Sequence, residues 1–262
     1  MKTQKEISNH HFETADSSHC DHRTNEAAAL PGTRSGGADG SRLRVLAVGA
    51  HPDDVELGCG GALVAHRRRG DDVAILVMTS GRSDISDYDR IAEQEQAARM
   101  LGARLMWGGF EDGCVPDGRP AVEVVEAAIR AFDADVVYTH AVHDSHQDHR
   151  ATAAAVLGAS RRVQRVLHYE SPSTLQFNPT LFVDIDGLVE TKLDLIRAHL
   201  SQVLTSSMVD VEAAEAQARY RGFASRTRNA EAFEVARFTW DLAQPVPEIT
   251  GAGALVRREA AM

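Results

Sequence analysis

The segment LRVLAVG (Leu43–Gly49) and the loop AHPDDVELGCGG (Ala50–Gly61) that follows it decide how this chain folds. The first segment is a continuous apolar run, which is typical of a β-strand buried on both faces of a parallel sheet. The loop places a histidine and two aspartates directly after this strand. Ligands of open α/β sheets bind outside the carboxyl ends of the strands, so this junction is a candidate functional site.

Strands and helices alternate along the rest of the chain. We predict strands at Leu43–Gly49, Val73–Thr79, Arg104–Trp107, Asp135–His140, Val166–Tyr169 and Leu181–Ile185. We predict helices at Gly60–Arg69, Arg90–Leu101, Ala121–Phe132, Arg150–Ala159, Leu188–Leu200 and Asp210–Ala224. This alternation predicts an α/β fold, a single Rossmann-like domain with a mostly parallel, doubly wound sheet.

Length, charge and cysteine content narrow the class of protein. The 262 residues suffice for one compact α/β domain, and the net charge of −10 argues against nucleic-acid binding, which needs a basic surface. No apolar run approaches the roughly 20 residues that cross a bilayer, and the N-terminus has no signal-peptide pattern. Three cysteines without a CxxC pair favour a reduced compartment. We therefore predict a cytoplasmic protein without nucleic-acid or membrane partners.

The two ends of the chain differ in composition from its centre. Residues 1–42 are poor in large apolar side chains and finish in LPGTRSGGADGS, which predicts a disordered extension. Residues 244–262 begin with closely spaced prolines and glycines and are predicted to form a flexible tail. The folded domain is therefore expected at residues 43–243. Four histidines in the extension could scavenge metal, although a solvated tail is the simpler interpretation.

The loop after the first strand can form part of a metal site. His51 and Asp54 are three residues apart, so one turn can aim both side chains at a common point, and Pro52 restricts the loop between them. A solvated turn with a helix-capping aspartate is the alternative. The glycines that follow match neither G-x-G-x-x-G nor the P-loop pattern, so close packing of a helix against the sheet explains them better than a phosphate cradle.

A second polar cluster, HAVHDSHQDHR, follows the predicted strand that ends at His140. His140, His143, His146 and His149 are four of the twelve histidines of the chain and fall within ten residues. Catalytic zinc takes three protein ligands and keeps one position for water, and the two loops can supply two histidines and a carboxylate. The same donors also suit non-haem iron. His140 and His143 are expected to support the site rather than to bind the metal.

The motifs AHPDDVELGCGG and HQDH together resemble the LmbE-like (PIG-L) family of zinc-dependent N-acetylglucosaminyl deacetylases. The resemblance covers roughly residues 43–240 and implies the LmbE-like fold. Further agreement is found at Thr79-Ser80-Gly81, Arg90-x-x-Glu93, Leu101-Gly102, Phe110-Glu111-Asp112-Gly113, His168-Tyr169-Glu170-Ser171, Lys192 with His199-x-Ser201-Gln202, and Ala230-Glu231-Ala232-Phe233. The family includes deacetylases of thiol-cofactor and antibiotic pathways.

The resemblance also implies a role for individual residues. It places the zinc ligands of the family at His51, Asp54 and His149. It places the general base at Asp53, and the histidine that stabilises the tetrahedral intermediate at His146, oriented by Asp148. Arg90 matches a family arginine near the sugar and is therefore a candidate substrate-binding residue. The chain departs from the family pattern at Arg82, where many members have a glutamate.

The function implied by the resemblance is zinc-dependent hydrolysis. The expected cofactor is Zn²⁺, and the expected partner is a small amino-sugar conjugate from which an N-acetyl group is removed. The thiol-cofactor or antibiotic precursor to which the sugar is attached is left open, as is the choice between monomer and homo-oligomer. Two alternatives predict different behaviour. A non-haem iron oxygenase that uses the same triad would consume oxygen, and a sugar- or nucleotide-binding module would need no metal.

Overall fold

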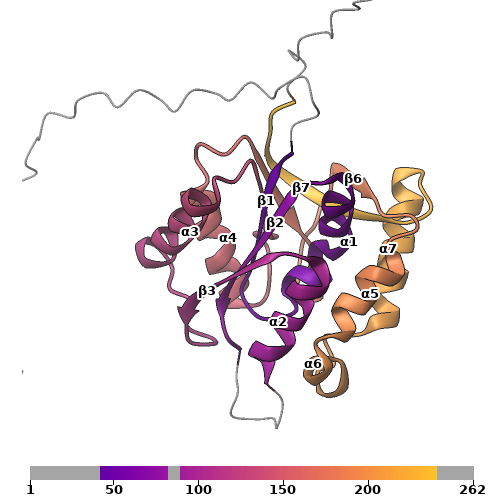
Figure 1. Ribbon diagram of the computed structural model, residues 1–262, viewed down its shortest axis with the longest axis horizontal. Coiled ribbons are helices and arrows are strands. Elements are labelled where there is room, and N and C mark those ends of the chain that lie inside the picture. Colours follow the sequence, from indigo (N-terminus) through magenta and orange to yellow (C-terminus); the bar gives the residue numbers. More distant parts are fainter. Residues whose placement is uncertain (1–41, 82–88, 241–262) are drawn as a thin grey trace, which may run out of the picture. The chain divides into compact units, whose positions relative to one another are not determined.

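Within residues 42–81 and 89–240, which the computed structural model describes, the chain forms one seven-stranded sheet (Figure 1). The strands are β1 (Arg44–Gly49), β2 (Asp72–Thr79), β3 (Arg104–Phe110), β4 (Val136–His140), β5 (Arg165–Tyr169), β6 (Leu181–Asp184) and β7 (Ala230–Phe238). Their spatial order is β3-β2-β1-β4-β5-β7-β6. Pairing is parallel from β3 to β5, whereas β7 runs antiparallel to both β5 and β6. The predicted mostly parallel α/β sheet is confirmed.

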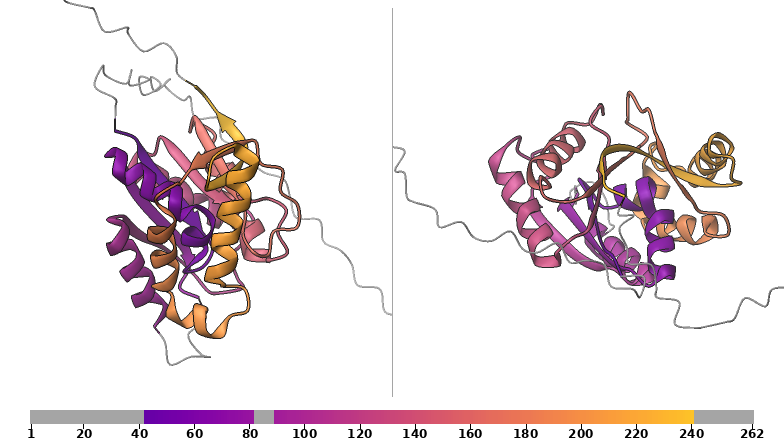
Figure 2. Two further views of the ribbon diagram at one scale, coloured as in Figure 1. Left: turned by 90° about the vertical axis from the view of Figure 1, so that its right-hand side faces the viewer. Right: turned by 90° about the horizontal axis from the view of Figure 1, so that it is seen from above.

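Helices cover both faces of this sheet (Figures 1 and 2). They are α1 (Asp54–Arg69), α2 (Arg90–Leu101), α3 (Arg119–Phe132), α4 (Gln147–Ala159), α5 (Val189–Arg197), α6 (Leu200–Thr205) and α7 (Val211–Ser225). Helices α3 and α4 pack on one face in a core that includes Leu46 and Val156. Helices α1, α2, α5 and α7 contribute to the core on the other face, which includes Val45 and Leu63. Each face of β1 is therefore buried, as its apolar sequence predicts.

The order of the strands explains where the two polar loops meet. Strand β1 pairs with β2 on one side and with β4 on the other, so the chain winds in opposite directions from this point. In such a sheet the crevice at the carboxyl ends of the two central strands is the usual ligand site. The loop after β1 carries His51, and the loop after β4 carries His146. The topology thus brings together two clusters that are far apart in the sequence.

Helix α1 begins at Asp54, not at Gly60 as predicted, and is broken at Cys59, where φ is −145°. The glycine-rich sequence GCGG therefore lies inside a helix rather than in a loop. A Cβ atom added at Gly58 would lie 2.1 Å from the ring of Tyr169, so only glycine allows the helix to approach β5 this closely. This contact supports the close-packing interpretation of the glycines. The low helix propensity of glycine led us to predict a later start for the helix, and the contact with Tyr169 outweighs that propensity.

The break in α1 leaves main-chain groups that two buried side chains satisfy. Lys192 of α5 donates a hydrogen bond from Nζ to the carbonyl oxygen of Leu57, at 2.7 Å. Glu231 of β7 accepts hydrogen bonds from the main-chain N–H groups of Gly61 and Ala62, at 2.8 and 2.7 Å. Lys192 also forms an ion pair with Glu231, and both side chains are buried. Buried main-chain groups need such partners, so this ion pair stabilises the break.

Other predicted elements also differ from the structure, and α3 and α4 begin two and three residues before their predicted starts at Ala121 and Arg150. Strand β7 was not predicted, because only its first half is buried and the exposed second half lacks a regular apolar alternation. The helix predicted at Leu188–Leu200 corresponds to α5, which ends at Arg197, and the short helix α6 that follows was not predicted. Strand β3 extends to Phe110 rather than ending at Trp107.

Most of the predicted terminal segments lie outside the described residues. The extension predicted at residues 1–42 overlaps them only at residue 42, and the tail predicted at 244–262 does not overlap them at all. Among the described helices, none combines the length and the hydropathy that a membrane crossing requires.

Candidate metal centre

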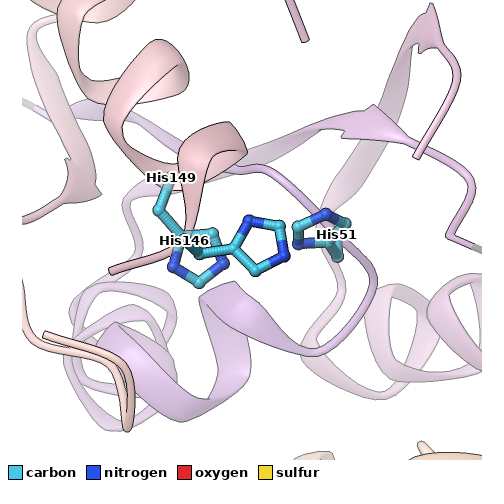
Figure 3. Close-up of side chains that lie close together, drawn as sticks. All are labelled: His51, His146 and His149. Atoms are coloured by element: carbon cyan, nitrogen blue, oxygen red, sulfur yellow. The ribbon is translucent and has the colours of Figure 1, made fainter. Parts of the chain in front are cut away.

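Two loops at the carboxyl ends of β1 and β4 bring three histidines together (Figure 3). His51 follows β1, whereas His146 precedes α4 and His149 lies in its first turn. The ring centroid of His51 lies 4.7 Å from that of His146 and 5.4 Å from that of His149. One nitrogen atom from each ring lies within 4.8 Å of the others, which is close enough for shared coordination of an ion.

Asp54 completes the donor set that the sequence predicts for a metal. Its Oδ2 atom lies 3.4 Å from Nδ1 of His51, and its Oδ1 atom lies 3.4 Å from Nε2 of His149. Two donors that each bind zinc at about 2.0–2.1 Å in tetrahedral geometry are separated by about 3.4 Å. The exposed fractions of His51, Asp54 and His149 are 7%, 6% and 6%, so bulk water competes little for these groups. The donor types of the three residues therefore suit zinc, and each of the two distances from Asp54 matches the separation of neighbouring zinc ligands.

The carboxylate of Asp54 stays ionised despite its burial. Burial alone would raise its pKa, but the neighbouring His149 and His140 outweigh that effect and hold the pKa well below the ordinary value. Nε2 of His140 lies 3.3 Å from Oδ2 of Asp54, and the main-chain N–H of His51 donates to the same oxygen at 2.7 Å. An ionised carboxylate is the form that binds a metal.

His51 is surrounded by carboxylates on both sides of its ring. Its Nε2 atom lies 3.1 Å from Oδ2 of Asp148 and 3.2 Å from Oδ1 of Asp112. Burial lowers the pKa of His51, but hydrogen bonds to Asp112, Asp148 and Asp54 outweigh burial and raise it to about 12. A carboxylate that accepts from one ring nitrogen of a histidine directs the other nitrogen toward a metal. The structure thus leaves Nδ1 of His51 facing Asp54.

His149 is oriented in the same way by a different carboxylate. Its Nδ1 atom lies 3.2 Å from Oδ2 of Asp144 and 3.2 Å from the hydroxyl of Ser173. Asp144 is buried, and it also accepts hydrogen bonds from the hydroxyl of Ser171 at 2.7 Å and from the main-chain N–H of His146 at 2.8 Å. These contacts leave Nε2 of His149 free to face Asp54, which is the nitrogen a metal would take.

Asp53 lies beside the donor set in a strained backbone conformation, with φ of 99°. Such left-handed values are rare outside glycine and often mark functional residues. Burial, with the adjacent charge of Asp54, raises the pKa of Asp53 to about 7. Nη2 of Arg90 lies 3.5 Å from Oδ2 of Asp53 and donates to the carbonyl oxygen of Pro52 at 2.8 Å. The Asp53 carboxyl can therefore exchange a proton near neutral pH.

His146 and Asp148 are in contact, but through the main chain. The N–H of Asp148 donates to Nδ1 of His146 at 3.2 Å, so the proton of the neutral imidazole lies on Nε2. The carboxylate of Asp148 instead faces His51 and accepts from the N–H groups of Gly113 and Val115, at 2.7 and 3.1 Å. Burial, with the charges of His51 and His149, lowers the pKa of His146 and favours its neutral form.

Three further residues of the site were assigned neither a ligand role nor a catalytic role from the sequence. Asp112 belongs to the quoted motif Phe110-Glu111-Asp112-Gly113, but nothing in its local spacing links it to His51. Asp144 was visible only as part of the histidine-rich loop. His140 was expected to support the site, and it stacks on His149 with centroids 3.9 Å apart. Asp112 contacts His51 and His140 contacts Asp54 from distant parts of the sequence, which spacing along the chain does not show. Asp144 contacts His149 from only five residues away.

Comparison with known proteins identifies the family of this chain. A family model described as GlcNAc-PI de-N-acetylase (PIG-L) matches residues 46–160. The uncharacterized deacetylase YaiS of Escherichia coli K12 is 34% identical over 170 residues, which cover 61% of this chain and 92% of that protein. The chain belongs to the PIG-L (LmbE-like) family. The region matched by the PIG-L model contains every residue of the proposed metal centre.

Two other PIG-L comparisons extend the similarity. A diacetylchitobiose deacetylase of Thermococcus kodakarensis is 27% identical over 187 residues, which cover 61% of this chain and 70% of that enzyme. The crystal structure of the conserved protein TT1542 from Thermus thermophilus aligns with a TM-score of 0.68 and 28% identity, covering 76% of this chain and 97% of that one. The PIG-L fold predicted from the sequence is therefore confirmed, and the family is one of deacetylases.

Proposed function

We propose that this PIG-L protein is a zinc-dependent hydrolase that removes the N-acetyl group from an N-acetylglucosamine-type sugar in a small conjugate. One observation carries the proposal. The buried imidazoles of His51 and His149 and the carboxylate of Asp54 lie next to a second carboxyl, that of Asp53, whose pKa is about 7. Amide hydrolysis at a metal needs both a site for the ion and a base that the ion does not use.

In this proposal His51, Asp54 and His149 hold the ion. Zinc, when bound, lowers the pKa of a water molecule and polarises the amide carbonyl. Asp53 accepts the proton of the attacking water and passes it to the departing amine, a task that suits a carboxyl that titrates near neutral pH. Nε2–H of His146 would donate to the developing oxyanion, because its Nδ1 is already engaged by the N–H of Asp148.

The proposed partner is a small amino-sugar conjugate. The similarity to a diacetylchitobiose deacetylase supports an N-acetylated sugar as the reacting group. Arg90 is proposed to contact a sugar hydroxyl, because its Nε atom is buried and has no hydrogen-bond partner among the described residues. Its guanidinium also contacts the loop that carries Asp53, so the sugar would lie directly beside the proposed base.

Metal content and amine release test this proposal together. We expect about one zinc per chain in the full-length protein, lost in His149→Ala, and release of free amine from N-acetylglucosamine or diacetylchitobiose. Any zinc bound by the histidines of residues 1–42 contributes equally to the wild-type protein and to His149→Ala, so the difference in zinc content reports on the proposed site. Asp53→Asn should keep its zinc and lose at least about 100-fold in kcat, since a general base contributes 10²–10⁴-fold. Iron with oxygen consumption would favour an oxygenase, and a fully active Asp53→Asn protein would refute the base assignment.

A further inference from the structure

A row of three buried polar side chains starts at the main chain of Asp53 and has no role in the proposed mechanism. It consists of Gln94 of α2, Glu56 of α1, and His199 between α5 and α6. All three side chains are essentially inaccessible to solvent, with exposed fractions of 0%, 1% and 0%. Burying three polar groups is unfavourable unless they make specific contacts, so their arrangement needs an explanation.

Gln94 is the member that touches the active-site loop. Its Oε1 atom accepts the main-chain N–H of Asp53 at 3.2 Å, and its Nε2 atom donates to Oε1 of Glu56 at 2.8 Å. The amide cannot be reversed, because its donor must face the carboxylate and its acceptor must face the N–H. Glu56 therefore fixes the direction in which Gln94 holds Asp53.

The opposite side of the same peptide is held from the same helix. Nη2 of Arg90 donates to the carbonyl oxygen of Pro52 at 2.8 Å, and that carbonyl belongs to the peptide that joins Pro52 to Asp53. Arg90 and Gln94 are four residues apart on α2 and so lie on one face of the helix. Side chains of helix α2 therefore form hydrogen bonds with both the C=O and the N–H of the peptide that precedes Asp53.

These two hydrogen bonds maintain a conformation of Asp53 that is unfavourable on its own. Asp53 has φ of 99°, and an isolated non-glycine residue would relax from this value. His199 lies at the far end of this row of side chains, with Nε2 at 3.4 Å from Oε2 of Glu56. The pKa of His199 is raised, because Glu56, Asp53 and Glu93 outweigh the effect of its burial. Nε2 of His199 and Oε2 of Glu56 nevertheless form no hydrogen bond among the described residues.

We propose that Gln94 is a positioning residue that, locked by Glu56, holds the strained peptide before Asp53 and so aims the Asp53 carboxylate at the reacting water. The inference rests on the proposed function, in which Asp53 is the base. Gln94 contacts none of the proposed zinc ligands in the described hydrogen bonds, so it acts on the base and not on the ion.

The test compares Gln94→Leu with Gln96→Leu in the full-length chain. Both changes replace glutamine by leucine on α2, but Gln96 is exposed and serves as the control. Gln94→Leu should lower kcat about 100-fold with KM and zinc content unchanged, because a misplacement of about 1 Å at a reacting group costs that much. Unchanged kcat, or zinc lost in proportion to activity, would overturn the proposal.

Exchanging the side chains of Glu56 and Gln94 tests whether kcat recovers when their hydrogen bond is restored. Gln94→Glu alone places two carboxylates face to face and should be slower than wild type. The double variant Glu56→Gln/Gln94→Glu restores one donor, one acceptor and the same net charge, so we expect it to recover at least tenfold in kcat over Gln94→Glu. A double variant as slow as Gln94→Glu would show that the hydrogen bond between Glu56 and Gln94 does not set the position of Asp53.

A crystal structure of Gln94→Leu separates this inference from the proposed function. We expect φ of Asp53 to leave the left-handed region once the N–H loses its partner, whatever the substrate proves to be. A wild-type protein inactive on every N-acetylated sugar would refute the proposed function, whereas an unmoved Asp53 would refute the role of Gln94.

Discussion

Replacing Lys192 by methionine should destabilise the fold more than any single surface change. The substitution keeps most of the apolar volume but removes the ammonium group, which donates to the carbonyl oxygen of Leu57 and pairs with Glu231. The broken helix α1 would then contain a buried carbonyl without a partner, and Glu231 would keep its charge without a counter-ion. Both groups are buried, so water cannot replace the lost contacts.

The magnitude follows from these two losses. A buried acceptor without a partner costs about 1–3 kcal/mol, and removing one partner of a buried ion pair costs about 3–5 kcal/mol in total. Glu231 keeps two main-chain donors, from Gly61 and Ala62, which lowers the penalty for its charge. We therefore expect a loss of about 3–4 kcal/mol in the free energy of unfolding. For a domain of about 200 residues this lowers Tm by roughly 6–16 °C.

Urea unfolding followed by far-UV circular dichroism measures the effect, with excess chelator so that bound metal does not contribute. Lys192→Met, Glu231→Gln and the double variant form a cycle, and the double variant should lose less than the sum of the single losses, because it leaves no buried charge unpaired. A Lys192→Met protein within about 1 kcal/mol of wild type, or strictly additive losses, would show that the ion pair does not stabilise the helix break.

Three further predictions concern α1 and its surroundings. Gly58→Ala should cost about 1–3 kcal/mol, measured as a lower Tm, because its Cβ would lie 2.1 Å from the Tyr169 ring; an unchanged Tm would contradict the close-packing argument. Cys59→Ala should cost about 1 kcal/mol and leave zinc content and turnover unchanged, whereas an inactive variant with normal zinc would give the thiol a catalytic role. Burial lowers the pKa of His66, so the unfolded chain binds a proton at this residue more readily, and the free energy of unfolding should fall as pH decreases from about 7 to 5. In urea titrations His66→Gln should make this pH dependence less steep. An equally steep dependence would show that His66 does not cause it.

The parts of the fold that follow from local pattern were predictable. The apolar run at Leu43–Gly49 and its repetition in later strands predict a parallel sheet, and the strand-end rule then locates both polar loops. The start of α1 was not predictable in this way, because glycine lowers helix propensity wherever it occurs. What compensates for that tendency is contact with Tyr169 of β5 and Glu231 of β7, and no local window contains these partners.

The same limit applies to the candidate site. The spacing of His51 and Asp54 within one turn indicates a pair of donors, and the histidine-rich loop indicates a second group. Their assignment to individual roles came from the family resemblance. Residues that contact the site from other elements, such as Asp112 and Gln94, carry no recognisable spacing, because their contacts with His51 and Asp53 depend on folding.

The hydrogen bonds from Gly61 and Ala62 to Glu231 also constrain when the protein can mature during synthesis. These contacts join positions 170 and 169 residues apart, so the ribosome has completed the whole region matched by the PIG-L model long before Glu231 emerges. Until then, the helix that begins at Asp54 lacks the side chain that satisfies its break. The turn proposed to bind metal, between His51 and Asp54, is therefore translated long before the helix that follows it can complete its contacts with β7.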